Sequence, residues 1–369
     1  MDVITGNSKR VGETVVDTAV IGGGQAGLAL GYHLAREGLE YVILDAYDRV
    51  GDAWRTRWHS LHLFTPAKFN GLPGMRFPGD RLAFPSKDEQ ADFLESYAAR
   101  FELRVQNGVR VESVRRDGES FIVRSGTRQW RARNVVVASG GCQSPRIPAF
   151  ATDLSPAVKQ MHSRAYRSPN QLGAGAVLVV GLGNSGAELA LEASRAHPAI
   201  VAARKPVELP FPHNRTVARY VLPIVKFLGL HLLTLRTPPG RKLATLGSTP
   251  LIRTRTGDLA AAGVRMVPRI AGARDGLPVT EDGEVLDVST VLWCTGYRND
   301  FSWIDAPAFD EDGEPVHERG VVGAVPGLYF LGQEFLYSIT SATLPGIGRD
   351  AKHLARAIRA QARERVLAA

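Results

Sequence analysis

The sequence predicts an α/β protein that contains two copies of one strand, glycine turn, helix and strand unit. The first copy begins with an apolar, β-branched run at residues 14–21, which leads directly into the glycine-rich turn at residues 22–27. The second copy begins with a similar run at residues 176–180, followed by a glycine-rich turn at residues 181–186. Two such units in 369 residues indicate two or at most three domains.

The first unit contains every element that a dinucleotide-binding unit needs. After the turn, apolar residues recur at helical spacing up to Ala35, and the pattern stops at Gly38, a typical residue for the end of a helix. A short strand follows at Tyr41 to Leu44, and it ends on Asp45. Strand, glycine turn, helix, strand and acid together predict a Rossmann-like dinucleotide-binding domain, whereas a glycine turn alone could bind nothing.

Each glycine of the first turn has a physical role. Gly22 makes the tight turn, Gly24 lets the backbone approach a pyrophosphate, and Gly27 lets the helix and the strand pack closely. The free N–H groups at the start of the helix then face the phosphates. We therefore expect the cofactor to contact these glycines and the residues that accompany them, namely Gln25, Ala26, Asp45 and Ala46.

The second unit differs from the first at the end of its second strand. Its turn contains Gly181, Gly183, Asn184, Ser185 and Gly186, all expected to bind a cofactor. A helix is expected at residues 187–195 and a strand at 200–203, and Arg204 and Lys205 follow. Arg204 stands as many residues beyond its last glycine as Asp45 does, so that bases replace the acid. A guanidinium pairs well with a 2′-phosphate, which predicts NADP, although two bases in a solvated loop are the alternative.

Two dinucleotide units in one chain imply that one cofactor passes electrons to the other. NADPH delivers hydride, so the first unit is expected to hold FAD. Trp54 and Arg55, shortly after the first acid, can pack against this cofactor. Two glycine-bearing segments that each close an apolar strand are expected where the chain passes between the two binding lobes: Ala138, Ser139 and Gly140 after residues 133–137, and Cys294, Thr295, Gly296 and Tyr297 after residues 288–293.

The C-terminal part of the sequence predicts a last buried strand and a long helix. The strand is expected at residues 327–332, where Gly332 is followed by Gln333. A helix that starts near Leu344 has one apolar face. Its positive end could face the flavin ring, where negative charge gathers on reduction.

Composition and charge exclude several other classes of protein. The net charge of +8 would suit an anionic partner, but the chain contains no nucleic-acid-binding module. Cys142 and Cys294 lie far apart, so we expect no disulfide scaffold, no dithiol redox centre and no metal site. A reducing cytoplasm fits this pattern. The N-terminal residues 1–17 contain no apolar signal segment, and the oily stretch at residues 220–235 is too short and too charged to span a membrane.

The motifs resemble those of the flavin-containing monooxygenases. The resemblance rests on both glycine turns, on Gly51-Asp52-Ala53-Trp54, and on Cys294-Thr295-Gly296-Tyr297. The segment at residues 58–66, followed by Leu72-Pro73-Gly74, is similar to a short bacterial branch whose members are labelled potassium-transport flavoproteins and resemble the plant YUCCA type. The resemblance covers residues 17–360.

In that family, reduced FAD and dioxygen form a C4a-(hydro)peroxyflavin, which oxygenates a soft nucleophile such as a sulfide, an amine or a carbonyl compound. The resemblance adds His62, Leu63 and Val111 to the expected FAD contacts. Thr65 and His162 are the nearest candidates for side chains at the reaction centre, although a lone histidine is more often structural.

The sequence also departs from the family. Only residues 162–166 remain of its identifying stretch, and its active-site asparagine has no counterpart near Thr65, because Asn70 is out of register. Gln333 stands where many FAD proteins carry Asp.

The expected architecture is of the three-layer ββα type with a small β-meander at residues 112–129. An FAD-binding domain is expected at residues 1–157 and 287–369, and an NADPH-binding domain is inserted at 158–286. The segment 206–256 looks like a further insertion. Its run at 217–235 could be a lid, a membrane-surface contact, a homodimer face or a helix packed over the cofactor cleft.

We predict an NADPH-dependent flavoprotein monooxygenase that acts on dioxygen and a small-molecule substrate, with FAD itself performing the oxygen chemistry. The alternative is an NADPH oxidase or reductase that passes electrons to a quinone or another small acceptor without inserting oxygen. A non-catalytic redox sensor linked to transport is a third reading, which rests only on the label of the bacterial branch.

Overall fold

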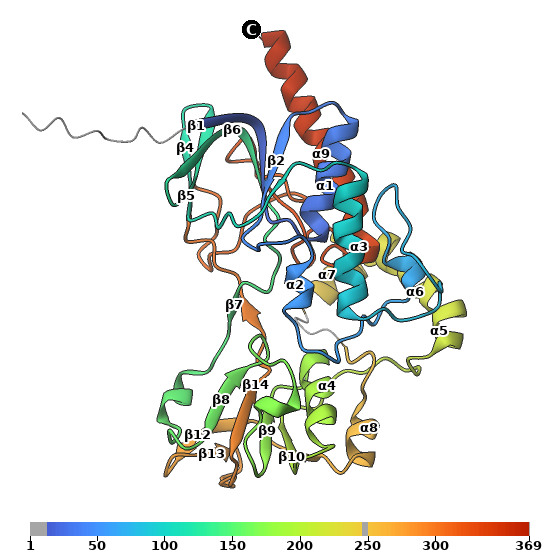
Figure 1. Cartoon of the computed structure of the whole chain (residues 1–369), viewed down its shortest axis with the longest axis vertical. Helices are drawn as coiled ribbons and strands as arrows, with labels where there is room; N and C mark the ends of the chain where they lie inside the picture. The colour runs from blue at the N-terminus through green and yellow to red at the C-terminus, as the bar shows by residue number, and fades with distance from the viewer. Residues whose placement is uncertain (1–12, 246–249, 369) are drawn as a thin grey trace, which may run out of the picture.

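The computed structural model describes residues 13–245 and 250–368 and consists of two lobes joined by a narrow neck (Figure 1). The larger lobe contains both ends of the described chain, and the smaller lobe contains the middle (Figure 1). Each lobe is built around a parallel sheet, which confirms the α/β fold with two Rossmann-like units.

The sheet of the larger lobe has the strand order β16-β4-β5-β6-β1-β2-β3, and β17 also pairs with β6. The strands are β1 (Glu13–Ile21), β2 (Tyr41–Leu44), β3 (Val105–Gln106), β4 (Ser113–Asp117), β5 (Ser120–Ser125), β6 (Arg128–Val137), β16 (Ile304–Asp305) and β17 (Leu328–Phe330). Strands β1, β2, β3, β6 and β17 are parallel, whereas β4 and β5 form the antiparallel meander. Because β6 belongs to both parts, one long strand joins the meander to the cofactor-binding sheet.

Helices cover the side of this parallel sheet that faces away from the meander (Figure 1). They are α1 (Gln25–Arg36), α2 (Asp52–Arg55), α3 (Lys87–Arg100) and α9 (Leu344–Ala368). A capping box between Ser86 and Glu89 fixes the start of α3. Apolar residues of α1 and α9, such as Leu30 and Leu354, are fully buried in one core with the sheet.

The sheet of the smaller lobe has the order β11-β10-β9-β14-β8, and every pairing in it is parallel. Its elements are β8 (Lys159–His162), β9 (Val177–Val180), α4 (Asn184–Ala193), β10 (Ala199–Ala202), α8 (Thr256–Ala261), β11 (Arg265–Val267) and β14 (Thr290–Trp293), with a hairpin of β12 (Ile270–Arg274) and β13 (Leu277–Thr280). The four consecutive strands β11-β10-β9-β14 repeat the arrangement β3-β2-β1-β6 of the larger lobe. Short 3₁₀ turns lie at Ala67–Phe69, Ala149–Asp153 and Pro169–Gln171.

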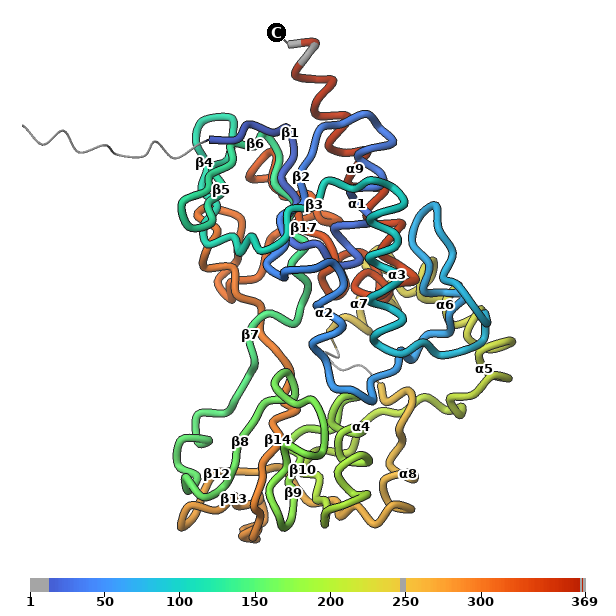
Figure 2. The backbone as a smooth tube through the Cα atoms, in the orientation of Figure 1, coloured from blue at the N-terminus to red at the C-terminus, as the bar shows by residue number. Residues whose placement is uncertain are grey.

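The neck is a two-stranded antiparallel ribbon of β7 (Ser144–Pro145) and β15 (Tyr297–Arg298) (Figure 2). These strands follow the two glycine-bearing segments at which we expected the chain to cross. The ribbon therefore holds both crossings side by side.

A second connection between the lobes is an excursion of residues 210–245, which leaves the smaller lobe after β10. Its helices are α5 (Arg215–Tyr220), α6 (Leu222–His231) and α7 (Pro238–Ala244), and they lie against the larger lobe (Figure 1). Arg349 of α9 donates to the carbonyl oxygen of Leu230, and the Leu235 N–H donates to the carbonyl oxygen of Tyr337. The base of the excursion is closed by hydrogen bonds between residues 207–209 and Leu251.

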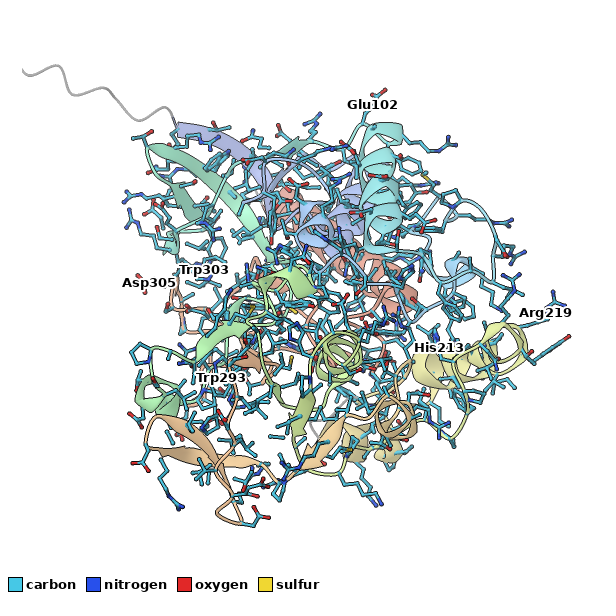
Figure 3. The ribbon with its side chains drawn as sticks, turned by 60° about the horizontal axis from the view of Figure 1, so that its bottom comes forward. Glu102, His213, Arg219, Trp293, Trp303 and Asp305 are labelled. Atoms are coloured by element: carbon cyan, nitrogen blue, oxygen red, sulfur yellow. The ribbon has the colours of Figure 1, made fainter. Side chains whose placement is uncertain are left out.

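Within the excursion, the amphipathic run at 217–235 is divided into two short helices that meet at Val221, near Pro223. Much of its apolar surface is exposed, with Ile224 60% and Phe227 61% accessible. Arg219 extends outward from α5, and His213 lies where the excursion reaches the larger lobe (Figure 3). In the described part of the chain, no helix is both long and apolar enough to cross a lipid bilayer.

Candidate functional site

The first glycine turn is held in place by the ends of two strands. The Gly22 N–H donates to the carbonyl oxygen of Leu44 over 2.8 Å, and Gly22 has a φ of +112°, which favours glycine. A methyl group on Gly22 would lie 2.5 Å from the carbonyl oxygen of Ala138, and one on Gly27 would collide with the carbonyl oxygen of Gly22. A methyl group on Gly24, by contrast, would meet no protein atom within 4 Å. Gly22 and Gly27 are thus needed by the fold itself, and Gly24 faces open space at the start of α1.

Asp45 follows β2 and lies beneath the first turn. Its side chain is buried, at 7% exposure, and its Oδ1 accepts a hydrogen bond from the Tyr47 N–H over 3.3 Å. Burial raises the pKa of Asp45, while the N–H groups of Tyr47, Ala46 and Gly23 favour the charged form. A carboxylate in this position can accept hydrogen bonds from ribose hydroxyls beside the turn.

The second glycine turn repeats the first in geometry. The Gly181 N–H donates to the carbonyl oxygen of Ala202 over 2.9 Å, and Gly181 has a φ of +101°. A methyl group on Gly181 would lie 2.5 Å from the carbonyl oxygen of Cys294, and one on Gly186 would collide with the carbonyl oxygen of Gly181. A methyl group on Gly183 would meet nothing within 4 Å. The two turns therefore share one backbone geometry although the side chains around them differ.

The sheet register corrects the expected equivalence of Asp45 and Arg204. Ile21 pairs with Leu44 in the first unit, and Val180 pairs with Ala202 in the second. The residue that follows each strand is therefore Asp45 in one unit and Ala203 in the other. The expectation from counting residues was wrong by one position, because the path from the last glycine to the strand is one residue shorter in the second unit.

This register places a small side chain where the first unit has an acid. Arg204 and Lys205 come immediately after Ala203, and both are exposed. Neither forms an ion pair within residues 13–245 and 250–368. Their positive charges at the end of β10 are therefore available to a phosphate group.

Asn184 and Ser185 begin α4, next to the second turn. The Asn184 side chain donates to the carbonyl oxygen of Pro250 over 3.0 Å and accepts from the Ile252 N–H over 2.9 Å. Asn184 thus fastens the chain that returns from the excursion to the second turn.

Glu188 is a charged residue of this region that sequence reasoning missed. Its side chain is only 10% exposed, its Oε1 lies 3.4 Å from Arg253 Nε, and its Oε2 has no hydrogen-bond partner in the described chain. Burial raises the pKa of Glu188 to about 7, against the opposing effect of Arg253. The only signal in the sequence was a carboxylate on the otherwise apolar face of α4.

The two crossings are the glycine-bearing segments at residues 138–140 and 294–297. Ala138 is buried, Ser139 is exposed, and Gly140 has a φ of +72°. Cys294 is half-buried, and burial raises the pKa of its thiol to about 12. Thr295 donates to the carbonyl oxygen of Arg146, which joins the two crossings.

His162 and Tyr297 meet at the second crossing. His162 Nε2 lies 3.0 Å from the carbonyl oxygen of Gly296, and its Nδ1 accepts from the Arg164 N–H over 3.1 Å. The ring is therefore neutral with its proton on Nε2, and burial lowers the pKa of His162. The Tyr297 hydroxyl accepts from Arg57 over 3.1 Å. Both nitrogens of His162 are thus occupied by backbone groups in a structural arrangement.

Trp54 and Arg55 lie on α2, between the first turn and α3. Trp54 Nε1 is 3.4 Å from Oε1 of Gln25, at the start of α1. Arg55 contacts carboxylates of α2 and α3, at 2.8 Å from Asp92 and 3.0 Å from Glu95. The structure therefore brings Trp54 to the first turn, whereas the guanidinium of Arg55 is engaged by acids.

The segment after α2 brings together Leu63, Thr65 and Asn70. Leu63 is buried, at 5% exposure. The Thr65 hydroxyl donates to Oδ1 of Asn70, and Asn70 Nδ2 donates to the carbonyl oxygen of Thr65 over 3.0 Å. Asn70 is fully buried, so this amide closes its own loop and offers no free group. His62 is exposed and Val111 is half-buried.

Gln333 provides a test of whether FAD fits the first unit. Gln333 is 6% exposed, and its Nε2 has no partner in the described residues. The preceding Gly332 lies against α1, since a methyl group there would be 3.1 Å from Ala26 Cβ. An orphaned amide donor beside the first turn suits the hydroxyl or phosphate oxygens of FAD. Leu344 begins α9 and is 7% exposed. The first turn, Asp45, Trp54 and Gln333 are the residues that would hold FAD.

Comparison with known proteins agrees with this site. Residues 19–223 match the family described as "Pyridine nucleotide-disulphide oxidoreductase". A solved flavin-containing monooxygenase from Stenotrophomonas maltophilia has a TM-score of 0.78 and 31% sequence identity, covering 95% of this chain and 99% of that one. The protein is thus an FAD- and NAD(P)-dependent oxidoreductase of the flavin monooxygenase class. It belongs to the pyridine nucleotide-disulphide oxidoreductase family, in its flavin-containing monooxygenase-like group.

Two curated relatives cover nearly all of the chain. An uncharacterized CzcO-like oxidoreductase of Geobacillus kaustophilus is 39% identical over 342 residues, which are 92% of this chain and 97% of that protein. The indole-3-pyruvate monooxygenase YUCCA1 of Oryza sativa subsp. japonica is 30% identical, over 96% of this chain and 94% of that protein. The resemblance to the flavin-containing monooxygenases is therefore confirmed.

Proposed function

We propose that the protein is an NADPH-dependent flavin monooxygenase that oxygenates a small soft nucleophile. The observation that carries this proposal is the pair of matched glycine turns. The strand after the first turn is followed by a buried acid, and the strand after the second by Ala203 and two bases that form no ion pair within the described residues. The first turn suits a cofactor with a free ribose, and the second suits one with a 2′-phosphate. When bound, FAD supplies the chemistry of hydride acceptance and oxygen activation.

The residues of the chain serve to bind and position. Asp45 and Gln333 offer an acceptor and a donor to the cofactor beside the first turn, and Arg204 offers a fork of N–H donors to a phosphate. No dithiol can take the electrons, because the chain has only two cysteines and burial keeps the thiol pKa of Cys294 at about 12. Dioxygen or another small acceptor is then the destination of the electrons.

Measurement of the reaction balance tests this proposal. Purified holoenzyme is given NADPH, ¹⁸O₂ and a small sulfide such as thioanisole, and NADPH oxidation, hydrogen peroxide and sulfoxide are measured together. We expect sulfoxide that contains ¹⁸O, in proportion to the NADPH oxidised. If the hydrogen peroxide formed equalled the NADPH oxidised with every sulfide, amine and ketone tested, oxygen insertion would be refuted.

One observation favours a second candidate function, an NADPH oxidase or reductase that passes electrons to a small acceptor. Both polar ends of the Asn70 amide are occupied by Thr65, so this segment offers no free amide group to the reaction centre. Faster NADPH oxidation with a soluble quinone under anaerobic conditions than with dioxygen would favour this function.

A further inference from the structure

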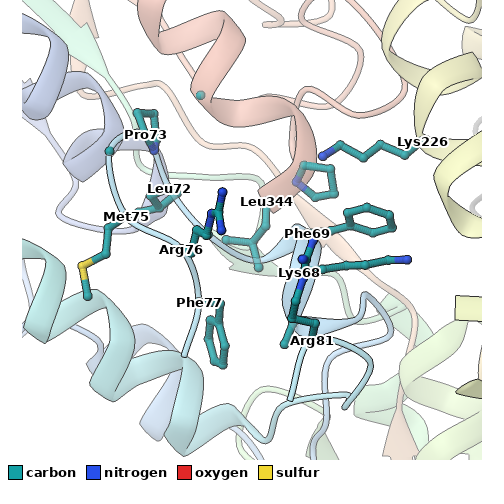
Figure 4. A pocket seen from close by; sticks show the side chains of 15 residues that line it. Lys68, Phe69, Leu72, Pro73, Met75, Arg76, Phe77, Arg81, Lys226 and Leu344 are labelled. Atoms are coloured by element: carbon teal, nitrogen blue, oxygen red, sulfur yellow. The ribbon is translucent and has the colours of Figure 1, made fainter. Parts of the chain in front are cut away.

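A cavity of about 540 Å³ lies between the segment 67–81, helix α6 and the start of α9 (Figure 4). The residues that line it include the cations Lys68, Arg76, Arg81 and Lys226, and none of the lining residues is acidic. No residue of either glycine turn belongs to this lining. The cavity thus lies outside both glycine turns, shares Leu344 with the expected FAD contacts, and has four positive side chains.

These four cations have no carboxylate partner in the part of the chain that the structure describes. Asp80, their neighbour in sequence, is engaged by Arg215 of α5 at 2.6 Å. The amine of Lys68 donates to a carbonyl oxygen, that of Arg219, at 3.4 Å. Because neighbouring like charges repel one another, such a cluster is stabilised when an anion enters it.

The two lysines share one aromatic ring. The amine of Lys226 lies 4.6 Å from the ring centre of Phe69, and that of Lys68 lies 5.0 Å from it. Burial lowers the pKa of Lys226, with a smaller effect from Lys68. Burial also lowers the pKa of Lys68, followed by the charge of Arg81. Both amines are thus partly desolvated beside one aromatic ring, and neither has a carboxylate partner among the described residues.

The rest of the pocket wall is apolar. Phe69, Leu72, Met75, Phe77 and Leu344 line it together with the cations. In Figure 4, the amine of Lys226 and the guanidinium of Arg76 point toward the start of α9. The positive end of this 25-residue helix adds to the field of the side chains. A ligand therefore meets charge at one side and hydrocarbon at the other.

We propose that this pocket binds an amphiphilic anion, a carboxylate or phosphate head group attached to an apolar body. The head group would pair with Lys226 and Arg76, and the apolar part would pack on the aromatic rings. The same α6 exposes Ile224, Phe227 and Leu228 to solvent, at 60%, 61% and 38%. A free acid and the head group of a lipid share this chemistry, and the experiment below separates the two sources.

Binding to the oxidised holoenzyme tests the proposal without turnover. Decanoate, below the concentration at which it forms micelles, is titrated by calorimetry, with decanol as the uncharged control. We expect decanoate to bind at least about tenfold more tightly than decanol, because the unpaired cations recognise only the charged group. In parallel, sedimentation is measured with vesicles of phosphatidylglycerol and of phosphatidylcholine.

Variants assign the binding to the pocket. Lys226→Gln and Arg76→Gln are each expected to weaken decanoate binding about tenfold. Lys242→Gln removes an exposed cation of α7 outside the pocket and serves as the matched control. Retained flavin absorbance shows that each variant is folded.

The outcomes separate the sources and decide the proposal. Decanoate binding that depends on Lys226 and Arg76, without vesicle binding, identifies a free acid as the ligand. Sedimentation with phosphatidylglycerol alone, lost in the same variants, identifies a lipid head group. Equal affinity for decanoate and decanol, or equal binding by the wild type and both pocket variants, overturns the proposal. Because no turnover is measured, these results do not depend on the proposed monooxygenase reaction.

Discussion

The two glycine turns have one backbone geometry and two chemistries. Gly22 and Gly181 have φ values of +112° and +101°, and each donates to the carbonyl oxygen at the end of the neighbouring strand. A methyl group on Gly22 or Gly181 would lie 2.5 Å from the carbonyl oxygen of Ala138 or Cys294, respectively. The side chains around these turns differ, since Asp45 corresponds to Ala203. We propose that the shared backbone sets where a pyrophosphate would bind, and that the differing side chains select the dinucleotide.

The largest expected difference between the two turns comes from substituting the last glycine of each. Gly27→Ala and Gly186→Ala both drive a methyl group into the carbonyl oxygen of the first glycine of the turn. Overpacking of this kind costs about 1–3 kcal/mol and displaces the turn. We expect Gly27→Ala to lose most of its flavin on purification, and Gly186→Ala to keep the flavin but to oxidise NADPH poorly.

Absorbance of the flavin per protein and the KM for NADPH distinguish the two variants. If both variants lost flavin equally, the assignment of one cofactor to each turn would be wrong.

The next largest effect should come from the end of β10. Ala203→Asp gives the second unit the acid of the first, which would repel a 2′-phosphate. Arg204→Gln removes a charge-assisted contact worth about 1.5–3 kcal/mol, so the KM for NADPH should rise by about one to two orders of magnitude. The KM for NADH should change little in Arg204→Gln.

Arg195→Gln, an exposed base after α4, is the control for this pair. Equal use of NADPH and NADH by the unaltered protein would contradict the role of Arg204.

A smaller effect is expected at the second glycines of the two turns. Methyl groups on Gly24 and Gly183 would meet no protein atom within 4 Å, so the apo fold should tolerate Gly24→Ala and Gly183→Ala. Only a bound pyrophosphate would meet the added methyl group. We expect weaker flavin binding in the first variant and a raised KM for NADPH in the second, with melting temperatures of the apoproteins unchanged. A lowered apoprotein melting temperature would show that the space is not reserved for a ligand.

The smallest effect concerns one position on the helix after each turn. Glu188 of α4 stands where α1 has Ala29, which is fully buried. Burial raises the pKa of Glu188 from 4.5 to about 7, so the folded protein holds a proton that the unfolded chain releases between these pH values. Stability is therefore lost as the pH rises through this window and stays low above it. Glu188→Gln should remove this loss, raising the melting temperature at pH 8 relative to the wild type by a few degrees, at about 2–4 °C per kcal/mol.

Glu208→Gln is the matched control, because its effect has the opposite sign. Hydrogen bonds from Thr256 lower the pKa of Glu208, so its contribution to stability is present above the unfolded pKa and is lost as the pH falls. Melting curves from pH 4 to 8 compare the two variants. A melting temperature of Glu188→Gln that followed the wild type at every pH would contradict the assignment.

The parts of this molecule that could be predicted from sequence are those set by local chemistry. The glycine turns were found because the first and last glycine of each leave no room for a side chain, and β2 was predicted with its observed bounds because all its residues are apolar or β-branched. The equivalence of Asp45 and Arg204 was wrong because sheet register depends on strand pairing, which counting along a chain does not reveal.

Long-range packing explains the features that the sequence did not reveal. Nothing near Lys226 in the sequence indicates that it lines one cavity together with Lys68 and Arg76. Glu188 likewise meets Arg253 of the returning chain only in the folded protein, because the two residues are far apart in the sequence. Asn70 is out of register with the family's asparagine, and the oxygen and nitrogen of its amide both bond to Thr65 of the same loop.

The excursion of residues 210–245 also has a consequence for protein engineering. Its helices leave the smaller lobe but hydrogen-bond to the larger one, at Tyr337 and Arg349. A fragment cut at the neck ribbon would separate these helices from the larger lobe. Apolar surface that the larger lobe covers would then be exposed, in addition to Ile224 and Phe227. The smaller lobe is therefore a poor candidate for transfer to another protein as an independent domain, unless the excursion is first replaced by a short linker between residues 209 and 251.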